Sequence, residues 1–346
     1  MSPAPLLEVS ELVVRFRLRG KFFAPARFIE AVSGVSFAIH QGETLGLVGE
    51  SGCGKTTVGR CVARLLEPES GNIHLLGANI THLSKRSLRA ARRNVHIVFQ
   101  DPYSSLNPRM TVDRILSGPL RYHGIAKGKP ALERVAAMLD KVGLSPELGK
   151  RHPHRLSGGQ RQRVAIARAL IAGSAMIVAD EPISALDACV QASILNLIRD
   201  LQSDIGFGCL FITHDLSAAE VTCQRLAVMY MGQLVELGPT KDLLADPKHP
   251  YTQALLSAVL VPDPAIQRSF VPALLSGEPP STLKPPAGCR FSSRCPHVMS
   301  ICTTSVPQFL AVPDTARWAR CHLLSDAHGS SRSRPTYVGR NQGVGR

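Results

Sequence analysis

A glycine-rich run that contains one lysine constrains this chain more than any other feature. Residues 49–56 read Gly-Glu-Ser-Gly-Cys-Gly-Lys-Thr, directly after the apolar run Thr44 to Val48 and before an amphipathic helical pattern. In a strand, loop and helix of this kind, backbone amides and the helix N-terminus face phosphate groups, while Lys55 supplies a charge and Thr56 a Mg²⁺ ligand. The run therefore predicts a loop that holds the phosphates of a nucleotide.

Short apolar runs alternate with helical patterns over most of the chain. Residues 176–179 and 209–213 read as two further buried strands, and each ends at polar residues. This alternation predicts an α/β fold with a parallel sheet whose ligands lie at the carboxyl edge. The helix after the glycine loop is expected to bury one face that includes Val58, Cys61 and Leu65.

Two changes in the pattern indicate further parts of the fold. Residues 101–165 are mostly helical in pattern and predict an inserted helical subdomain. From Pro247 onward proline is frequent and strand patterns fade. We therefore expect a nucleotide-binding domain at 1–245, a small irregular domain with four cysteines at 246–324, and a disordered tail at 325–346.

Composition limits the partners of the chain. The net charge of +14 is dispersed and only 5% of residues are aromatic, so we expect no nucleic-acid ligand. A basic face near anionic lipid explains the charge equally well. Because no apolar run reaches the ~20 residues that span a bilayer, we expect a soluble, unexported protein without a direct membrane span.

Polar side chains follow three of the expected strands. Asp180 and Glu181 end the apolar run at 176–179, where one carboxylate can hold Mg²⁺ and the other can accept the proton of a water that attacks a γ-phosphate. His214 can hydrogen-bond that phosphate, and Gln100 can reach Mg²⁺ or the water. An acidic strand end, a structural histidine and a loop amide are the alternative interpretations.

These residues, together with Leu156-Ser157-Gly158-Gly159-Gln160 and the turn at 184–187, resemble the ATP-binding subunit of an ABC transporter over about residues 6–245. The resemblance implies a P-loop NTPase core, RecA-like, with an ABC β-subdomain and an inserted helical subdomain. It implies catalytic roles for Glu181, His214 and Gln100, and Mg²⁺ ligands among Thr56, Gln100 and Asp180. The implied ATP-binding residues are Phe16, Gly49, Glu50, Ser51, Gly52, Cys53, Gly54, Lys55, Thr56, Thr57, Ser157, Gly158, Gly159 and Gln160.

The signature turn Ser157 to Gln160 has a separate role in this family. By the resemblance it contacts the γ-phosphate of ATP that is bound to the opposite subunit, with its helix N-terminus directed at the phosphate. Each chain would then supply half of a site that a second chain completes. We therefore expect the isolated chain to bind ATP and to hydrolyse it poorly.

Three further segments resemble the second, F-type ATPase subunit of dipeptide and oligopeptide importers: residues 17–30, 99–108 and 249–255. This implies four kinds of partner or ligand: a non-identical ATPase subunit, two permease subunits, an extracytoplasmic substrate-binding protein and a peptide cargo. It places the chain peripherally on the cytoplasmic face of the bacterial inner membrane. A nickel chelate, glutathione or a sugar is an alternative cargo, and a soluble ABC ATPase that acts on nucleic acid is an alternative class.

The C-terminal cysteines Cys289, Cys295, Cys302 and Cys321 are the remaining candidates for a metal site. In a reducing compartment four thiols can enclose a metal centre, and their spacing alone leaves zinc and iron–sulfur open. The resemblance points to a [4Fe-4S] cluster. Structural Zn²⁺ and four reduced, packed cysteines are the alternatives.

Overall fold

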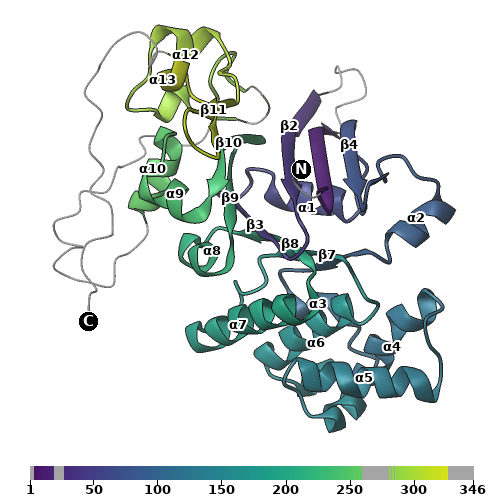
Figure 1. Ribbon diagram of the computed structural model, residues 1–346. Coiled ribbons are helices and arrows are strands. Elements are labelled where there is room, and N and C mark those ends of the chain that lie inside the picture. Colours follow the sequence, from purple (N-terminus) through teal and green to yellow (C-terminus); the bar gives the residue numbers. More distant parts are fainter. Residues whose placement is uncertain (1–3, 19–26, 259–279, 282, 284, 326–346) are drawn as a thin grey trace, which may run out of the picture. The chain divides into compact units, whose positions relative to one another are not determined.

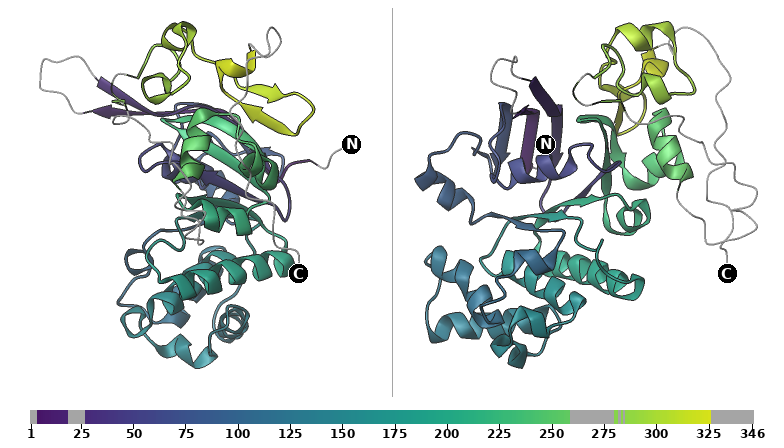
Figure 2. Two further views of the ribbon diagram at one scale, coloured as in Figure 1. Left: turned by 90° about the vertical axis from the view of Figure 1, so that its left-hand side faces the viewer. Right: turned by 180° about the vertical axis from the view of Figure 1, so that it is seen from behind.

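The computed structural model describes residues 4–18, 27–258, 280, 281, 283 and 285–325. The chain divides into two compact units (Figures 1 and 2). Unit 1 comprises residues 1–12, 36–45 and 56–213, and unit 2 comprises 13–35, 46–55 and 214–346. The tail that was expected to be disordered lies outside the described residues from 326 onward, as do residues 19–26 of the first insertion.

A parallel sheet is the core of unit 1. Strands β6 (Val95–Val98), β7 (Met176–Asp180) and β8 (Gly208–Thr213) pair in that order. Every residue of β7 and β8 is buried, which explains their continuous apolar sequences. The predicted parallel sheet is therefore confirmed.

Helix α1 (Lys55–Val62) follows the glycine loop and packs on this sheet in unit 1. A methyl group at Gly59 would meet Ile212 at 2.7 Å, so the helix lies close against β8. The helix is shorter than its apolar pattern predicts. Because Arg64 has a φ of 53°, the chain turns there, and Leu65 is 50% exposed.

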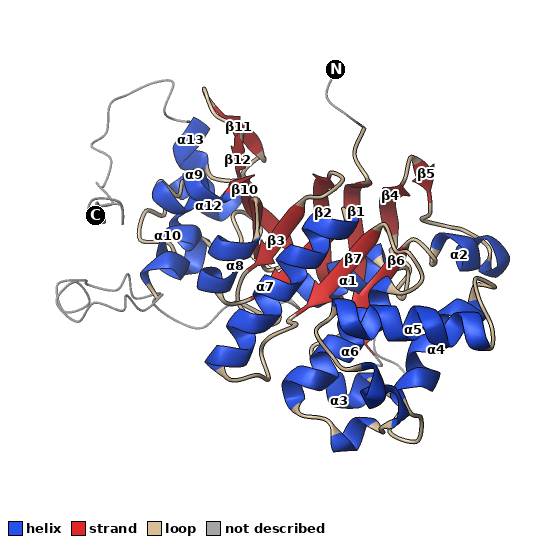
Figure 3. Cartoon of the chain, turned by 60° about the horizontal axis from the view of Figure 1, so that its bottom comes forward, coloured by secondary structure: helices blue, strands red, loops and turns tan. Residues whose placement is uncertain are grey.

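The predicted helical insertion lies between β6 and β7 in the sequence and on one side of the sheet (Figures 1 and 3). Helices α4, α5 and α6 pack against one another, and α6 also contacts α7. The elements of this insertion are α3 (Pro102–Ser105), α4 (Val112–Tyr122), α5 (Lys129–Lys141), η1 (Pro146–Lys150), η2 (Pro153–Arg155) and α6 (Gly158–Leu170), whereas α7 (Ala188–Ile205) follows β7.

Unit 2 contains an antiparallel sheet to which the cysteine-bearing segment contributes. Strand β10 (Gln233–Pro239) pairs with β9 (Arg225–Tyr230) on one side and with β12 (Arg317–Ala319) on the other, and β12 pairs with β11 (Leu310–Val312). The short helices of this unit are α8 (Leu216–Thr222), α9 (Thr240–Ala245), α10 (Pro250–Ser257), η3 (Ser292–Arg294), α12 (Ser300–Thr304) and α13 (His322–Ser325).

Each of three N-terminal strands contains residues of both units. They are β1 (Leu7–Leu18), β2 (Arg27–Ile39) and β3 (Thr44–Val48). Strands β1 and β2 also belong to a separate four-stranded sheet of order β2-β1-β4-β5, which includes β4 (Ser70–Leu75) and β5 (Ala78–Asn79). Helix α2 (Lys85–Ala91) follows β5 in the sequence. Within the described part of the chain, no helix combines the length and the apolar character that a membrane crossing requires.

Candidate active site

The glycine loop of unit 2 is built by close backbone approach. Gly49 has a φ of 152° and Gly54 a φ of 108°, and a methyl group at these positions would meet Met229 O at 2.1 Å and Ala31 O at 2.3 Å. Only glycine fits such a backbone without displacing a carbonyl. The loop conformation is therefore fixed by neighbouring strands as well as by its own sequence.

Lys55 is buried beneath this loop with its ammonium group directed back at the chain. Its Nζ donates to Gly49 O at 2.7 Å and to Glu50 O at 2.9 Å, and the residue is 5% exposed. The amide of Cys53 donates to Glu50 O at 3.3 Å. The loop thus places one buried cation beside a tightly turned backbone, and a cation in such a loop is suited to binding phosphate.

In unit 1 the residue after Lys55 contacts the end of β7. Thr56 Oγ1 donates to Asp180 Oδ1 at 2.9 Å, and Asp180 is 4% exposed. A hydroxyl and a carboxylate side by side are the oxygen ligands that Mg²⁺ takes. The structure therefore brings together two of the residues that the sequence assigned to a metal.

Glu181 and Gln100 also meet, although 81 residues separate them in the chain. Gln100 Nε2 donates to Glu181 Oε2 at 2.9 Å, because β6 and β7 are parallel neighbours and both residues follow the same edge. Glu181 has a φ of 47°, and its amide donates to Ile212 O at 2.9 Å. A non-glycine residue in this conformation stores strain of about 1–3 kcal/mol and is typical of functional sites.

His214 and Phe16 belong to unit 2, and each is exposed there. Asp215, the residue after His214, caps helix α8 by accepting the amides of Ser217 and Ala218. Phe16 lies on β1 and is 40% exposed, which leaves its ring accessible for stacking.

The signature turn begins helix α6 of unit 1 with a capping box. Ser157 Oγ accepts the amide of Gln160 at 3.2 Å, and Gln160 Oε1 accepts the amide of Ser157 at 3.1 Å. The amides of Gly158 and Gly159 fall in the first turn, where a helix has no internal acceptor for them. The positive end of the helix macrodipole therefore lies at Ser157 to Gln160.

The four C-terminal cysteines lie within electrostatic range of one another in unit 2. Burial, together with neighbouring thiols of the same set, raises the pKa of Cys295 to about 11 and that of Cys321 to about 12. Backbone N–H groups at His297 and Leu323 counteract this by donating to the two sulfurs. Among the residues described, however, no three His, Cys, Asp or Glu side chains are arranged to hold a metal ion.

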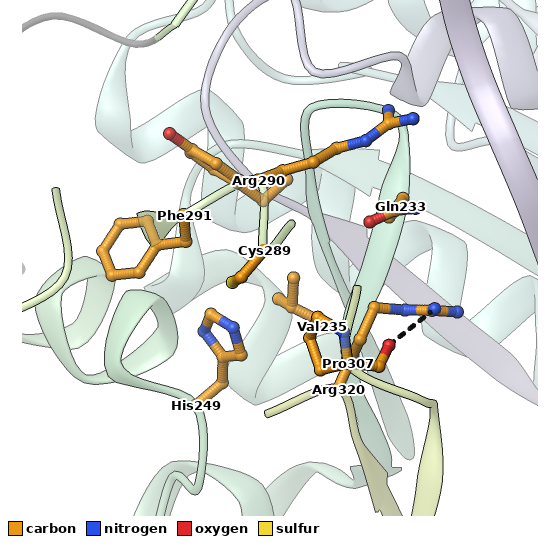
Figure 4. A pocket seen from close by; sticks show the side chains of 9 residues that line it. Gln233, Val235, His249, Cys289, Arg290, Phe291, Pro307 and Arg320 are labelled. Carbon is orange, nitrogen blue, oxygen red and sulfur yellow. Dashed lines mark hydrogen bonds between the residues drawn. The ribbon is translucent and has the colours of Figure 1, made fainter. Parts of the chain in front are cut away.

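Cys289 also lines a small cavity with His249, Phe291 and Arg320 (Figure 4). The cavity measures about 10 Å³, so it has room for about one water molecule and not for a peptide or nucleotide. His249 is 1% exposed, and burial lowers its pKa to about 3. We therefore treat this cavity as part of the packing of unit 2.

Two side chains that contact the glycine loop were not identified from the sequence. Tyr251 and Arg294 both bond to Glu50, from positions 201 and 244 residues away. No local pattern marks such contacts, because each partner is separated from the loop by most of the chain. Tyr251 lies in the segment 249–255 that resembles the importer ATPases, and Arg294 lies between Cys289 and Cys295, but neither signal indicates a contact with Glu50.

Comparison with known proteins now identifies the family. The model of the ABC transporter family matches residues 32–184, and that of the oligopeptide/dipeptide transporter C-terminal region matches residues 235–302. The chain belongs to the ATP-binding subunits of ABC transporters, in the oligopeptide/dipeptide branch. This confirms the predicted family and fold, and the activity is ATP hydrolysis coupled to transport.

Individual relatives cover nearly all of the sequence. The chain is 46% identical over 335 residues to YkfD of Bacillus subtilis, covering 96% of this chain and 100% of that protein. It is 45% identical over 306 residues to the oligopeptide transport ATP-binding protein OppF of Escherichia coli, covering 87% and 92%. The solved dimer of the ATP-binding cassette MJ0796 with ADP and Pi matches at a TM-score of 0.61 and 27% identity, covering 68% and 98%.

Proposed function

We propose that this chain energises the import of dipeptides or oligopeptides through separate permease subunits fed by an extracytoplasmic binding protein. The observation that carries this is the match of residues 235–302 to the oligopeptide/dipeptide transporter C-terminal region. OppF, with its name of oligopeptide transport ATP-binding protein, supports the same cargo. The chain would act peripherally on the cytoplasmic face of the bacterial inner membrane, and neither an alternative cargo nor a nucleic-acid ATPase is favoured.

For the ATP site we assign roles to the residues as follows. The loop from Gly49 to Thr57 holds the triphosphate, and Phe16 stacks on adenine. Thr56, Asp180 and Gln100 hold Mg²⁺, which supplies charge neutralisation on the phosphates. The hydrogen bond of 2.9 Å between Thr56 Oγ1 and Asp180 Oδ1 supports this, because it places both oxygens close enough to bind the same Mg²⁺ ion.

The hydrolytic step is assigned to Glu181 and Gln100, at the edge of the unit 1 sheet, and to His214 of unit 2. Glu181 accepts the proton of the attacking water, Gln100 orients that water, and His214 donates a hydrogen bond to the γ-phosphate. The contact between Gln100 and Glu181 supports this pairing, since it holds the carboxylate in one orientation. The chemistry is phosphoryl transfer to water, in which positioning and charge stabilisation dominate.

A second, non-identical ATPase subunit completes the site in this proposal. Ser157 to Gln160 face the ATP of that subunit, and their position at the N-terminus of α6 supports this use. The chain alone would then bind ATP and turn it over slowly. Mixing it with candidate partner ATPases should restore turnover, and full activity of the isolated chain as a monomer would contradict the shared site.

For the four cysteines we propose a [4Fe-4S] cluster bound by Cys289, Cys295, Cys302 and Cys321, with Zn²⁺ as the alternative. The proposal is supported by the chemistry of four thiols within electrostatic range of one another, with backbone N–H groups at the sulfurs of Cys289, Cys295 and Cys321. The described side chains are not arranged to hold a metal as they stand, so binding would require them to move closer together. Iron, acid-labile sulfide and zinc would be measured on protein purified without oxygen. Cys302→Ser should abolish the bound metal, and protein that lacks both metals would support four reduced cysteines instead.

The mechanism is tested by Glu181→Gln, which keeps the size of the side chain and removes the base. We expect turnover in the assembled transporter to fall by about 10²–10⁴-fold while ATP binding is retained. Glu133→Gln, on the exposed face of α5, is the matched control. Unchanged turnover of Glu181→Gln would contradict the assignment, and uptake of labelled peptides by a strain that lacks the gene would test the cargo.

A further inference from the structure

The cysteine-bearing segment reaches the phosphate loop through one arginine. Arg294 Nη1 donates to both carboxylate oxygens of Glu50, at 3.1 and 3.0 Å, and the Arg294 side chain is only 7% exposed. Glu50 is the second residue of the loop, and its side chain is 29% exposed. Both residues belong to unit 2. A guanidinium this well buried is a fixed partner of the carboxylate rather than a mobile surface charge.

The backbone of the same loop residue is held from a second element. The amide of Glu50 donates to Tyr251 Oη at 2.8 Å, and Tyr251 in α10 is fully buried. Its ring packs against Tyr230, with ring centroids 4.6 Å apart, and against Phe291 at 5.6 Å. Arg294 also lies over this group, since its Nη1 is 3.4 Å from Tyr230 Oη. The amide and the carboxylate of Glu50 are thus fixed by the same aromatic cluster.

Arg290 anchors the beginning of the segment to β2. Its Nη2 donates to Glu30 Oε1 at 2.8 Å and to Ser33 Oγ at 3.0 Å, and its Nη1 donates to Met231 O. In Figure 4 its side chain extends away from Cys289 and His249. Residues 289–295 are therefore attached to the nucleotide-binding part of unit 2 at both ends of η3.

The position of Glu50 matters for an anionic ligand in two ways. Its carbonyl oxygen accepts Lys55 Nζ at 2.9 Å, so a displacement of Glu50 also displaces the lysine that faces phosphate. Its carboxylate would repel a nearby triphosphate unless a cation neutralises it, because like charges a few ångströms apart cost on the order of 1 kcal/mol even in water. Arg294 supplies that cation.

We propose that Arg294 is a positioning residue for ATP: it neutralises Glu50 and, with Tyr251, holds the phosphate loop in its binding conformation. The C-terminal extension thereby raises the affinity of this chain for ATP, in addition to any metal that it binds. The inference rests on the ATP site proposed above at Gly49 to Thr57.

The test is a comparison of dissociation constants for a fluorescent ATP analogue with Mg²⁺, measured on the full-length chain. Arg294→Gln should weaken binding about tenfold. Arg294→Lys, which keeps the charge, should recover most of the affinity. In a Glu50→Gln background, Arg294→Gln should weaken binding by no more than about threefold relative to Glu50→Gln alone, because no unpaired carboxylate remains.

Arg317→Gln is the matched control. Arg317 is a buried arginine of the same extension, 5% exposed, and it donates to Asp242 O and Asp246 O instead of the phosphate loop. Its substitution should leave ATP affinity within about twofold while lowering thermal stability. Equal weakening by Arg317→Gln and Arg294→Gln would overturn the inference, because the effect would then be a general loss of packing.

Two further outcomes separate this inference from the proposed ATP site. If Arg294→Gln weakens binding as much in the Glu50→Gln background as in the unaltered chain, or if Arg294→Gln binds normally, the positioning role is wrong while the site stands. Lys55→Gln is measured in parallel and should reduce binding strongly. If Lys55→Gln leaves affinity unchanged, the proposed ATP site itself fails and the inference fails with it.

Discussion

Two glycines of the phosphate loop should respond very differently to the same substitution. Gly52 has a φ of 79° with no atom within 4 Å of an added methyl group. Gly54 has a φ of 108°, and the same methyl group would lie 2.3 Å from Ala31 O and 2.8 Å from Met229 Cε. Both positions carry the cost of a positive φ, but only Gly54 also requires its neighbours to move. Gly54→Ala should therefore be the more destabilising change.

The backbone conformations and contacts of the two glycines set the expected losses in free energy of unfolding. A left-handed alanine costs about 1 kcal/mol, which is the whole effect expected for Gly52→Ala. Displacing a backbone carbonyl in a packed region adds roughly 2 kcal/mol, so Gly54→Ala should lower the free energy of unfolding by about 3 kcal/mol. With a urea dependence of about 2 kcal/mol per M, the two midpoints should differ by about 1 M.

Urea unfolding without nucleotide measures this difference directly. The single tryptophan of the chain, Trp318, is 37% exposed in β12 and belongs to unit 2 with both glycines, so its fluorescence reports the relevant unit. Equal midpoints for Gly52→Ala and Gly54→Ala would refute the reasoning. A lower urea midpoint for Gly52→Ala than for Gly54→Ala would also refute it, because the contact of the added methyl group with Ala31 O would then not determine the loss of stability.

Two other predictions concern unit 1. Burial, with His123 and Arg168 nearby, holds the pKa of His96 at about 4, so the folded state binds fewer protons than the unfolded state between about pH 4 and 6.5. The free energy of unfolding should therefore fall by up to about 3 kcal/mol as pH drops through that window, and His96→Asn should flatten the curve measured by denaturation at several pH values. Ser157→Ala should cost about 1 kcal/mol of stability through loss of the cap. Ser157→Asp should keep the cap and stability yet lower ATP hydrolysis, since a carboxylate would face the partner's phosphate; unimpaired hydrolysis would contradict the role proposed for the signature turn.

Much of this site could be predicted from the sequence because its parts are local. The phosphate loop is encoded by glycines and a lysine within one short run, and the capping box by Ser157 and Gln160, three residues apart. Buried strands such as β7 and β8 show as continuous apolar runs. The end of α1 was less predictable, because the apolar pattern continues to Leu65 while the backbone turns at Arg64.

By itself, then, the sequence determined the family and the α/β core, and it supplied the residue types of the proposed ATP site, since backbone geometry and charge at short spacing follow from consecutive residues. Only the tertiary structure decided which distant side chains meet. Gln100 reaches Glu181 across 81 residues, Thr56 reaches Asp180 across 124, and Arg294 reaches Glu50 across 244. Such contacts depend on strand order and on packing summed over a whole unit, which no short window of sequence contains.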